Sequence, residues 1–403
     1  MMVFSQILQN TGKLAIVGLV GAVLTSCQLG QLSLPGQSQL SNNPPVVNSA
    51  LPPASGEVIG NGKVRVALLL PLTAPGNAGK IGAELKNAAK LAMRDFGQNT
   101  LQLVIKNTGG QAADAQSAAS SAIAERSSVV LGPLFSGSVA AASSVTLPAK
   151  LSMVAFSSDP KRARRGVYLM SFSPAADIRR SINFAISQGK TRFVTLLPNG
   201  AYGALAENTL RQVLNRNRAQ LVAIQKYDHS NASIEAAVQS VVSQAKTADV
   251  IFIPDGGKVP GAILSALSKS GVDIGARMVL GSGQWESTNL SSGLFNRAIF
   301  TGRDKRQFAN FAARYKAAYG STPSSTAGLA YDAVSMVAGL ARRRGANPFS
   351  FANIESRNGY SGVNGIFRFE ASGKADRGLA IYQVQSGVPQ IVSKAPATFG
   401  PGS

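Results

Sequence analysis

Short apolar runs alternate with amphipathic segments along most of the chain. Residues 64–70 form an apolar run that ends at Pro71, which is typical of a strand buried on both faces of a parallel sheet. Alanine and leucine then recur at helical spacing over residues 81–96. The alternation continues towards the C-terminus, without an internal repeat at a solenoid period. We therefore predict right-handed strand–helix–strand units and a doubly wound α/β fold.

The predicted elements fall into two series. The first has strands at 64–70, 101–105, 128–131 and 151–156, and helices at 81–96, 112–125 and 138–147. The second has helices at 178–188, 202–215, 233–247 and 261–270, and strands at 192–197, 221–227, 250–254 and 277–281. Helices at 304–319 and 327–343 and strands at 365–370 and 380–385 follow. A chain of 403 residues exceeds the size at which one core usually divides, so we expect two lobes.

The N-terminus has a different pattern. Lys13 precedes the apolar run 14–23, and small residues stand just before Cys27. This is the layout of a secretory signal over residues 1–26. The run is shorter than the roughly 20 residues that a membrane-spanning helix needs. A buried N-terminal helix is the alternative interpretation.

The sequence Leu24-Thr25-Ser26-Cys27 resembles the lipobox of bacterial lipoproteins, in which the signal is cut before the cysteine and that residue receives acyl chains. Cys27 is the only cysteine, so a disulfide within the chain is excluded, and a stray thiol is the alternative. Gln28 replaces the aspartate that marks retention in the inner membrane. The resemblance therefore implies a periplasmic protein that is lipid-anchored to a membrane, with the outer membrane favoured.

Residues 27–62 are rich in Gln, Ser, Asn, Pro and Gly and lack an apolar period, so we predict a flexible tether. The whole chain holds 40 Lys and Arg against 19 Asp and Glu, a net charge of +21. Removal of the signal would leave this excess almost unchanged. A basic excess of this size favours anionic partners. For an exported protein these partners belong to the cell envelope, and nucleic acid is not expected.

Four stretches resemble the type I periplasmic binding proteins of the leucine/isoleucine/valine-binding family. They are Val66-Ala-Leu-Leu-Leu-Pro-Leu-Thr73, Val130-Leu-Gly-Pro-Leu-Phe-Ser136 with Met153-Val-Ala-Phe-Ser-Ser158, Tyr319-Gly-Ser-Thr-Pro323 with Ala330-Tyr-Asp-Ala333, and Ser361-Gly-Val-Asn-Gly-Ile-Phe-Arg-Phe-Glu-Ala-Ser-Gly373. The likeness runs from about residue 64 to about residue 392. It implies two doubly wound, Rossmann-like lobes that are joined by three crossovers and separated by a ligand cleft. Lobe one would comprise residues 63–176 and 302–345, lobe two residues 177–301 and 346–392, and residues 393–403 would form a tail.

The candidate ligand residues of lobe one follow two predicted strands. Ligands of open α/β sheets bind beyond the carboxyl ends of the strands. Ser136 and Ser138 stand where a helix begins, so their hydroxyls and nearby N–H groups are candidates for binding a carboxylate. Capping of that helix is the alternative. Ser157 and Ser158 match the second ligand loop of the family, and the resemblance implies that the paired loops hold the carboxylate and ammonium of an amino acid.

Lobe two supplies the remaining candidates. Tyr202 stands where the resemblance implies an aromatic side chain that covers the ligand, with edge packing as the alternative. Asp255 ends an apolar strand and is a candidate for binding a ligand ammonium, although Asp255-Gly256 is also an ordinary turn signal. Trp285, the only tryptophan, is expected either to close the pocket or to pack in the core or at its rim.

Two basic clusters stand out, Lys161-Arg-Ala-Arg-Arg165 and Arg342-Arg-Arg344. We favour solvated faces for both. Anionic glycan strands, lipid head groups or a protein partner are the alternatives.

Catalytic motifs are almost absent from the sequence. His229 is the sole histidine, so a Ser/His/Asp triad or a histidine metal site lacks material. No phosphate-cradling loop is present. Ser187-Gln-Gly-Lys190 fits the Ser-x-x-Lys pattern of penicillin-binding enzymes, but its companion motifs are missing and it ends a predicted helix. We predict no enzyme, no metal and no cofactor.

Two functions remain. The first is an amino-acid-type solute-binding protein of an ABC transporter, with a small amino-acid-like ligand as its partner. The second, by resemblance to the penicillin-binding-protein activators, is a non-enzymatic activator of a peptidoglycan synthase. The ligand-loop serines favour the first, whereas the lipid anchor, the tether and the charge favour the second.

Overall fold

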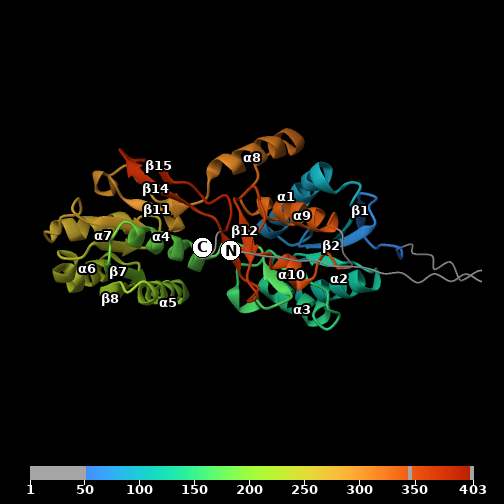
Figure 1. Cartoon of the computed structure of the whole chain (residues 1–403), viewed down its shortest axis with the longest axis horizontal. Coiled ribbons are helices and arrows are strands. Elements are labelled where there is room, and N and C mark those ends of the chain that lie inside the picture. The colour runs from blue at the N-terminus through green and yellow to red at the C-terminus, as the bar shows by residue number, and fades with distance from the viewer. Residues whose placement is uncertain (1–50, 344–346, 400–403) are drawn as a thin grey trace, which may run out of the picture. The chain divides into compact units, whose positions relative to one another are not determined.

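The computed structural model of the chain describes residues 51–343 and 347–399. The predicted signal, Cys27 and the tether up to residue 50 lie outside the described residues. The described chain folds into two lobes, each built on its own sheet (Figure 1). Among the helices of this part of the chain, none combines the length and the apolar character needed to cross a bilayer.

Lobe one is built on a sheet of order β1-β3-β2-β4-β5-β6. Strands β2 to β6 run parallel, and β1 pairs antiparallel with β3. The strands are β1 (Glu57–Ile59), β2 (Val64–Leu70), β3 (Leu101–Asn107), β4 (Val129–Leu131), β5 (Met153–Ala155) and β6 (Val167–Leu169). The helices of lobe one are α1 (Asn77–Ala92), which continues as a π-helical turn (Met93–Gly97), α2 (Ala112–Ala124), α3 (Ser136–Thr146), α8 (Lys305–Tyr319), α9 (Ala327–Ala341) and α10 (Phe351–Ile354).

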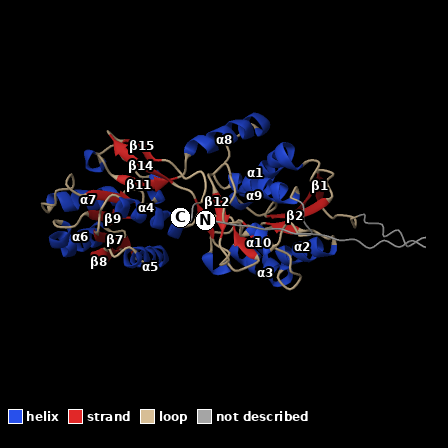
Figure 2. Ribbon diagram, viewed as in Figure 1, coloured by secondary structure: helices blue, strands red, loops and turns tan. Residues whose placement is uncertain are grey.

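Helices cover both faces of this sheet (Figure 2). Val66, Leu68 and Leu70 of β2 face the core that contains α1 and α9, whereas Ala67 and Leu69 face the core that contains α2 and α3. All five side chains are fully buried. Burial on both faces explains why β2 is apolar at six of its seven positions and not only at alternate ones.

Lobe two is built on a sheet of order β15-β14-β11-β10-β9-β7-β8. Its strands are β7 (Arg192–Pro198), β8 (Gln220–Tyr227), β9 (Val250–Ile253), β10 (Met278–Gly281), β11 (Ile299–Gly302), β14 (Ala380–Gln385) and β15 (Val388–Ser393). Strands β7 to β11 run parallel, and the hairpin β14-β15 adds antiparallel at β11. Helices α4 (Pro174–Ser187) and α5 (Ala201–Arg216) cover one face, and α6 (Asn231–Ala245) and α7 (Val259–Lys269) cover the other. The predicted fold of two doubly wound α/β lobes is confirmed.

The division between the lobes differs from the prediction in one segment. Residues 347–377 were expected in lobe two, but α10 and the small sheet of β12 (Phe367–Phe369) and β13 (Ala375–Arg377) belong to lobe one. Phe349, Ile354 and Phe367 are buried in the core of lobe one. The chain enters the lobe-two sheet again only at β14. An apolar segment does not specify which of two similar cores it joins, so the sequence could not place this boundary.

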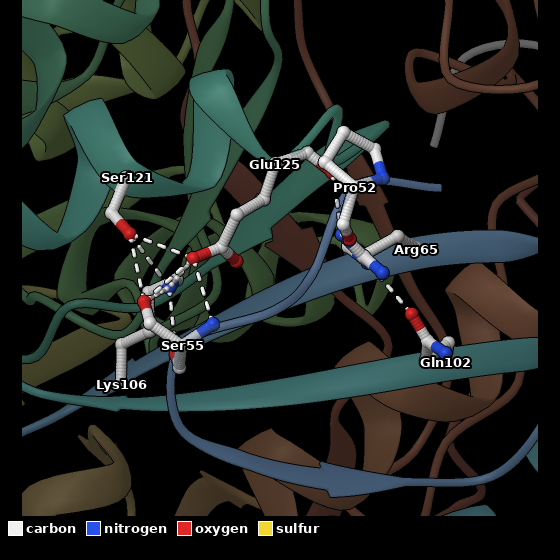
Figure 3. Close-up of polar contacts among 7 residues, drawn as sticks. All are labelled: Pro52, Ser55, Arg65, Gln102, Lys106, Ser121 and Glu125. Carbon is white, nitrogen blue, oxygen red and sulfur yellow. Dashed lines mark hydrogen bonds and ion pairs between the residues drawn. The ribbon is translucent and has the colours of Figure 1, made fainter. Parts of the chain in front are cut away.

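The predicted tether also differs from the structure at its C-terminal end. The prediction extended to residue 62, but the chain from residue 51 is attached to lobe one. Strand β1 pairs with β3, and Ser55 enters a buried polar network (Figure 3). The Ser55 hydroxyl donates to Glu125 Oε1 at 2.6 Å, and its backbone N–H donates to the same oxygen at 2.9 Å. Ser55 thus has buried charged partners, which attach this part of the segment to lobe one.

An ion pair lies at the centre of this network. Lys106 Nζ is 2.8 Å from Glu125 Oε1, and the two side chains are only 5% and 8% exposed. Burial alone would raise the pKa of Glu125, but the hydrogen bonds from Lys106, Ser55 and Ser121 outweigh it and lower that pKa to about 2. Arg65 extends the network by donating to the carbonyl oxygens of Pro52 at 2.6 Å and of Glu125 at 2.8 Å.

Candidate functional site

The ligand-loop serines of lobe one meet at a carboxylate. Ser136, the first residue of α3, donates its hydroxyl to Asp159 Oδ2 at 2.5 Å and accepts from Arg162 Nε at 2.9 Å. The hydroxyl of Ser157, after β5, accepts the backbone N–H of Asp159 at 3.2 Å. Two loops that follow neighbouring parallel strands are thus joined through Asp159.

The other two serine candidates are placed differently. Ser138 is buried, and its hydroxyl lies 3.4 Å from the carbonyl oxygens of both Gly110 and Gln111. Ser158 is exposed. The N-cap position of α3 is occupied by Phe135, which makes no side-chain capping bond. The capping alternative for Ser136 and Ser138 is therefore not what the structure has.

Asp159 and Arg162 form a charged pair that solvent reaches, with side chains 28% and 36% exposed. The hydrogen bond from Ser136, together with the N–H of Lys161, holds the pKa of Asp159 below its ordinary value, so the carboxylate is ionised at neutral pH. The cluster thus offers both an anion and a cation at the edge of the sheet. The sequence prediction missed Asp159, although the capping sequence Asp159-Pro160 directly follows the two predicted serines, and it placed Arg162 only in a basic cluster with a solvated face.

The other arginines of the first basic cluster also have partners. Arg164 donates to Ser143 Oγ at 2.9 Å, and Arg165 makes two hydrogen bonds of 3.0 Å to the Glu355 carboxylate. These bonds tie the loop after β5 to α3 and to the segment that follows α10. Arg164 and Arg165 are exposed, so the prediction of a solvated face holds for them, and their hydrogen bonds lie on that face.

Lobe two has its own polar cluster beyond the carboxyl ends of β8 and β9. The Tyr227 hydroxyl donates to Asp255 Oδ2 at 2.9 Å, and His229 Nε2 lies 2.9 Å from the same oxygen. Burial and the Asp255 carboxylate raise the pKa of Tyr227 above its ordinary value, so its hydroxyl stays protonated and donates. Tyr202 lies next to this cluster, because its hydroxyl donates to the carbonyl of Pro254 at 3.0 Å.

Trp285 belongs to the core. The side chain is fully buried, and its Nε1 donates to the carbonyl of Ile253 at 2.9 Å. Phe295 packs edge-on against it, with ring centroids 5.3 Å apart. A Cβ atom at Gly281 would lie 2.3 Å from the indole, so the ring covers the end of β10 closely. The core-packing alternative for Trp285 is confirmed.

A separate cavity lies where the chain crosses between the lobes. Its volume is about 260 Å³, and its walls include Phe172, Asp177, Arg303 and Arg377. The guanidinium carbons of Arg303 and Arg377 lie 4.8 and 4.9 Å from the ring centroid of Phe172. The six predicted ligand residues, all within the described chain, do not line this cavity.

The carboxyl group of Asp177 lies half-buried in the wall of this crossover cavity. It accepts the N–H of Gly283 at 2.7 Å and contacts the Thr301 hydroxyl. Burial raises the pKa of Asp177 to about 7, because the hydrogen bond from Gly283 does not compensate for the lost hydration. Asp177 is therefore half protonated near neutral pH.

We expect Asp177→Asn to change the pH dependence of stability. The folded chain holds this proton up to about pH 7, whereas the unfolded chain releases it near 3.8, so the wild-type protein loses stability as the pH rises through this window. The free energy of unfolding of the Asn variant, relative to that of the wild-type protein, should therefore rise by up to about 1.4 kcal/mol per pH unit between these values. Denaturant unfolding at about pH 4 and about pH 8 measures it, with the exposed Asp114→Asn as the control. An equal change in the free energy of unfolding between these two pH values in Asp177→Asn and in the wild-type protein would contradict the raised pKa of Asp177.

Comparison with known proteins places the chain in a family. A sequence model described as periplasmic binding protein matches residues 63–389. An uncharacterised protein of Rickettsia prowazekii is 21% identical over 219 residues, which are 52% of this chain and 58% of that protein. The match thus spans less than two thirds of that relative's length.

Several solved structures share the fold. A putative branched-chain amino acid ABC transporter protein of Rhodospirillum rubrum has a TM-score of 0.71 and 18% identity, over 82% of this chain and 99% of that one. A branched-chain amino acid ABC transporter periplasmic ligand-binding protein of Burkholderia xenovorans has a TM-score of 0.62 and 15% identity, over 84% and 97%. An ABC transporter substrate-binding protein of Desulfitobacterium hafniense in complex with Leu has a TM-score of 0.54 and 18% identity, over 82% and 99%.

The family and the fold are those of binding proteins and not of enzymes, and they are typical of the periplasm. The match to the family covers most of the chain, and the two-lobed architecture agrees with it. The chain therefore belongs to the periplasmic binding protein family and has the type I, leucine/isoleucine/valine-binding-like fold.

Proposed function

We propose that the chain is an exported solute-binding protein that holds an amino-acid-type ligand between its lobes and presents it to an ABC transporter. One observation carries the proposal: the two strand-end clusters offer complementary charges. Lobe one offers the Ser136 hydroxyl and the Arg162 guanidinium, and lobe two offers the Asp255 carboxylate. An α-amino acid carries a carboxylate and an ammonium group, which match these partners.

In the structure, Asp159 occupies the hydrogen-bonding groups that a ligand carboxylate would use. A ligand carboxylate that reaches Ser136 competes with Asp159 for the same hydroxyl and the same guanidinium. Ligand binding should therefore release Asp159 from Ser136. Ligands of similarly folded proteins support a carboxylate, because the Desulfitobacterium hafniense protein was crystallised with Leu and a solute-binding protein of Rhodopseudomonas palustris (TM-score 0.52) with 3,4-dihydroxybenzoic acid. Closure of the lobes requires only that the ligand contacts both clusters better in the closed state.

A ligand screen tests this function. We expect at least one amino acid to raise the melting temperature of the chain in a concentration-dependent way, by mass action. Calorimetric titration of that amino acid should then show about tenfold or greater loss of affinity for Ser136→Ala and for Asp255→Asn, since each change removes a hydrogen bond to a charged ligand group.

Ser144→Ala is the matched control. Ser144 lies on the same helix as Ser136, is exposed and bonds only its own helix through the carbonyl of Ala141. The affinity of Ser144→Ala for the amino acid should equal that of the wild-type protein. If no amino acid binds, or if all three variants bind equally well, the solute-binding proposal fails.

The predicted lipid anchor is part of the same proposal. Acylation of Cys27 would hold the chain at a membrane, with the outer membrane favoured by Gln28. Mass spectrometry of the N-terminal peptide should detect acyl chains on Cys27. The Cys27→Ser variant should lose them and move to the soluble fraction of the periplasm.

Activation of a penicillin-binding protein in peptidoglycan synthesis is the second candidate. Two observations favour it: the net charge of +21, which suits an acidic partner, and the internal pairing of the strand-end clusters, whose polar groups have partners without a ligand. The test measures glycan polymerisation by a peptidoglycan synthase with and without the chain. An increased rate together with an empty amino-acid screen would favour this candidate over the first.

A further inference from the structure

Lobe two has a second concave site at the edge of the sheet opposite the strand-end cluster. The end of α4, the amino ends of β10 and β11, and the strands β14 and β15 line a cavity of about 410 Å³. Three of its lining residues are cations: Lys190, Arg277 and Arg297. No acidic residue of the described chain is among those that line it.

Arg277 is oriented by neutral partners. Its Nη2 donates to the carbonyl of Lys246 at 2.5 Å and its Nη1 donates to the carbonyl of Ala248 at 3.0 Å. Its Nε is buried and has no hydrogen-bond partner among the residues that the structure describes. Carbonyl oxygens carry no net charge, so the positive charge of this fixed guanidinium is not neutralised.

Arg297 stands at a backbone position that disfavours it. Its φ of 67° lies in the left-handed region, where glycine or asparagine is preferred. Its N–H donates to the carbonyl of Val384 at 2.8 Å, which ties the turn to β14, and its side chain is exposed. Arg297 therefore presents its charge to solvent from a turn that this hydrogen bond fixes.

Lys190 completes the set. Gly189, with a φ of 76°, follows the end of α4, and the N–H of Lys190 donates back to the carbonyl of Ala185 at 3.1 Å. The acid that interacts with Lys190 is Asp249, whose Oδ2 accepts the backbone N–H groups of Thr191 and Arg192. Asp249 is not a lining residue, so the lining keeps its excess of positive charge.

Stabilisation of helix ends does not explain the three cations together. A cation just after a helix interacts favourably with the helix dipole, and Lys190 fits this explanation. Arg277 follows a loop of several residues after α7, and Arg297 follows only a short 3-10 turn, Gly293–Phe295. The dipole therefore accounts for one of the three at most.

We propose that this cavity binds a phosphate-class anion, either a free phosphate compound or the phosphate of a lipid headgroup. Arg297 offers a planar group whose forked N–H donors match the oxygens of phosphate, and Arg277 and Lys190 add two further positive charges. This site lies at the amino ends of the strands, whereas the proposed amino-acid site lies at their carboxyl ends. Its occupation does not depend on the amino-acid ligand.

Inorganic phosphate is the first probe. The full chain carrying Cys27→Ser, so that no acyl chain can form, is titrated by calorimetry at constant ionic strength with chloride as the reference anion. We expect saturable binding of phosphate that Arg297→Asn weakens by about tenfold. Asparagine tolerates the left-handed backbone, so the melting temperature of this variant should not fall.

Arg218→Asn is the matched control. Arg218 is also an exposed arginine of lobe two in the left-handed region, with a φ of 55°, and it does not line the cavity. Its replacement removes the same charge and should leave the affinity within about twofold of the parent. Lys190→Gln serves as a second variant in case Arg297→Asn lowers the melting temperature, and it should also weaken binding.

Vesicles distinguish the two sources of the phosphate group. The same chain is sedimented with vesicles of phosphatidylcholine, with and without phosphatidylglycerol. Binding only to the anionic vesicles, lost in Arg297→Asn and competed by phosphate, identifies a headgroup site, whereas phosphate binding without vesicle binding identifies a soluble ligand. The proposal is overturned if neither probe binds, or if Arg218→Asn and Arg297→Asn lose affinity equally, because binding would then follow net charge alone.

Discussion

Lys106→Met is expected to lower the free energy of unfolding by about 3 to 5 kcal/mol. The substitution leaves the Glu125 carboxylate buried next to Ser55 and Ser121 without its counter-ion, 2.8 Å from where the ammonium group lay (Figure 3). An unpaired buried charge is costly because the protein interior cannot replace its hydration. Denaturant unfolding at neutral pH, followed by circular dichroism, measures the loss.

Lys86→Met provides the control for this prediction. Lys86 Nζ lies 2.6 Å from Glu57 Oε2, but these side chains are 27% and 40% exposed. An exposed ion pair contributes little, so the free energy of unfolding should change by less than about 1 kcal/mol. Similar losses in both variants would contradict the special role of the buried pair.

The same ion pair predicts acid sensitivity of lobe one. The pKa of Glu125 is about 2 in the folded chain and near 4.5 when unfolded. Its contribution to stability is thus fully present above pH 4.5 and is lost as the pH falls towards 2. Unfolding curves recorded through this window should show a decrease for the wild-type protein that is smaller for Glu125→Gln. An equal decrease in both proteins would assign acid sensitivity to other groups.

Trp285→Ala should lower the free energy of unfolding by about 3 to 5 kcal/mol, since it empties the largest buried side-chain site of lobe two. The change also removes the hydrogen bond to the carbonyl of Ile253. Circular dichroism is the suitable measurement, because the variant lacks the only tryptophan.

Trp285→Phe separates the two contributions of this side chain. It keeps an aromatic ring against Phe295 but leaves the Ile253 carbonyl without its donor, so its loss should be clearly smaller than that of Trp285→Ala. If Trp285→Ala were nearly neutral, the indole would not be part of the core, and its alternative role at a pocket would need to be considered again.

Local pattern was sufficient for most of the secondary structure. Strand β2 begins and ends where the apolar run does, and α2 ends within one residue of the predicted bound. Periodicity is a property of consecutive residues, so segments of seven or more residues carry enough of it to be identified. Strands β1, β6, β11, β13 and β15 were missed. The three-residue strands β6 and β13, for example, are extended through pairing with β5 and β12 and not through a pattern of their own.

The candidate site was predictable only in its location. The loops after β4 and β5, with Ser136 and Ser157, were identified by resemblance to a family. That Asp159 and Arg162 hold Ser136 depends on how the two loops meet, which no spacing in the sequence specifies. The same holds for Asp255, because its partner Tyr227 ends a different strand and its partner His229 follows that strand.

The sequence by itself thus determined the class of fold, the order of most of its elements and the family, because these depend on local periodicity and on contiguous motifs. The tertiary structure decided which lobe residues 347–377 join, and it brought Asp177 and Arg377 to one cavity although 200 positions separate them. It also placed Lys106 against Glu125, so that these two charged residues form a buried ion pair. Burial and the pairing of charges are properties of the packed chain, since they depend on which segments exclude water from one another.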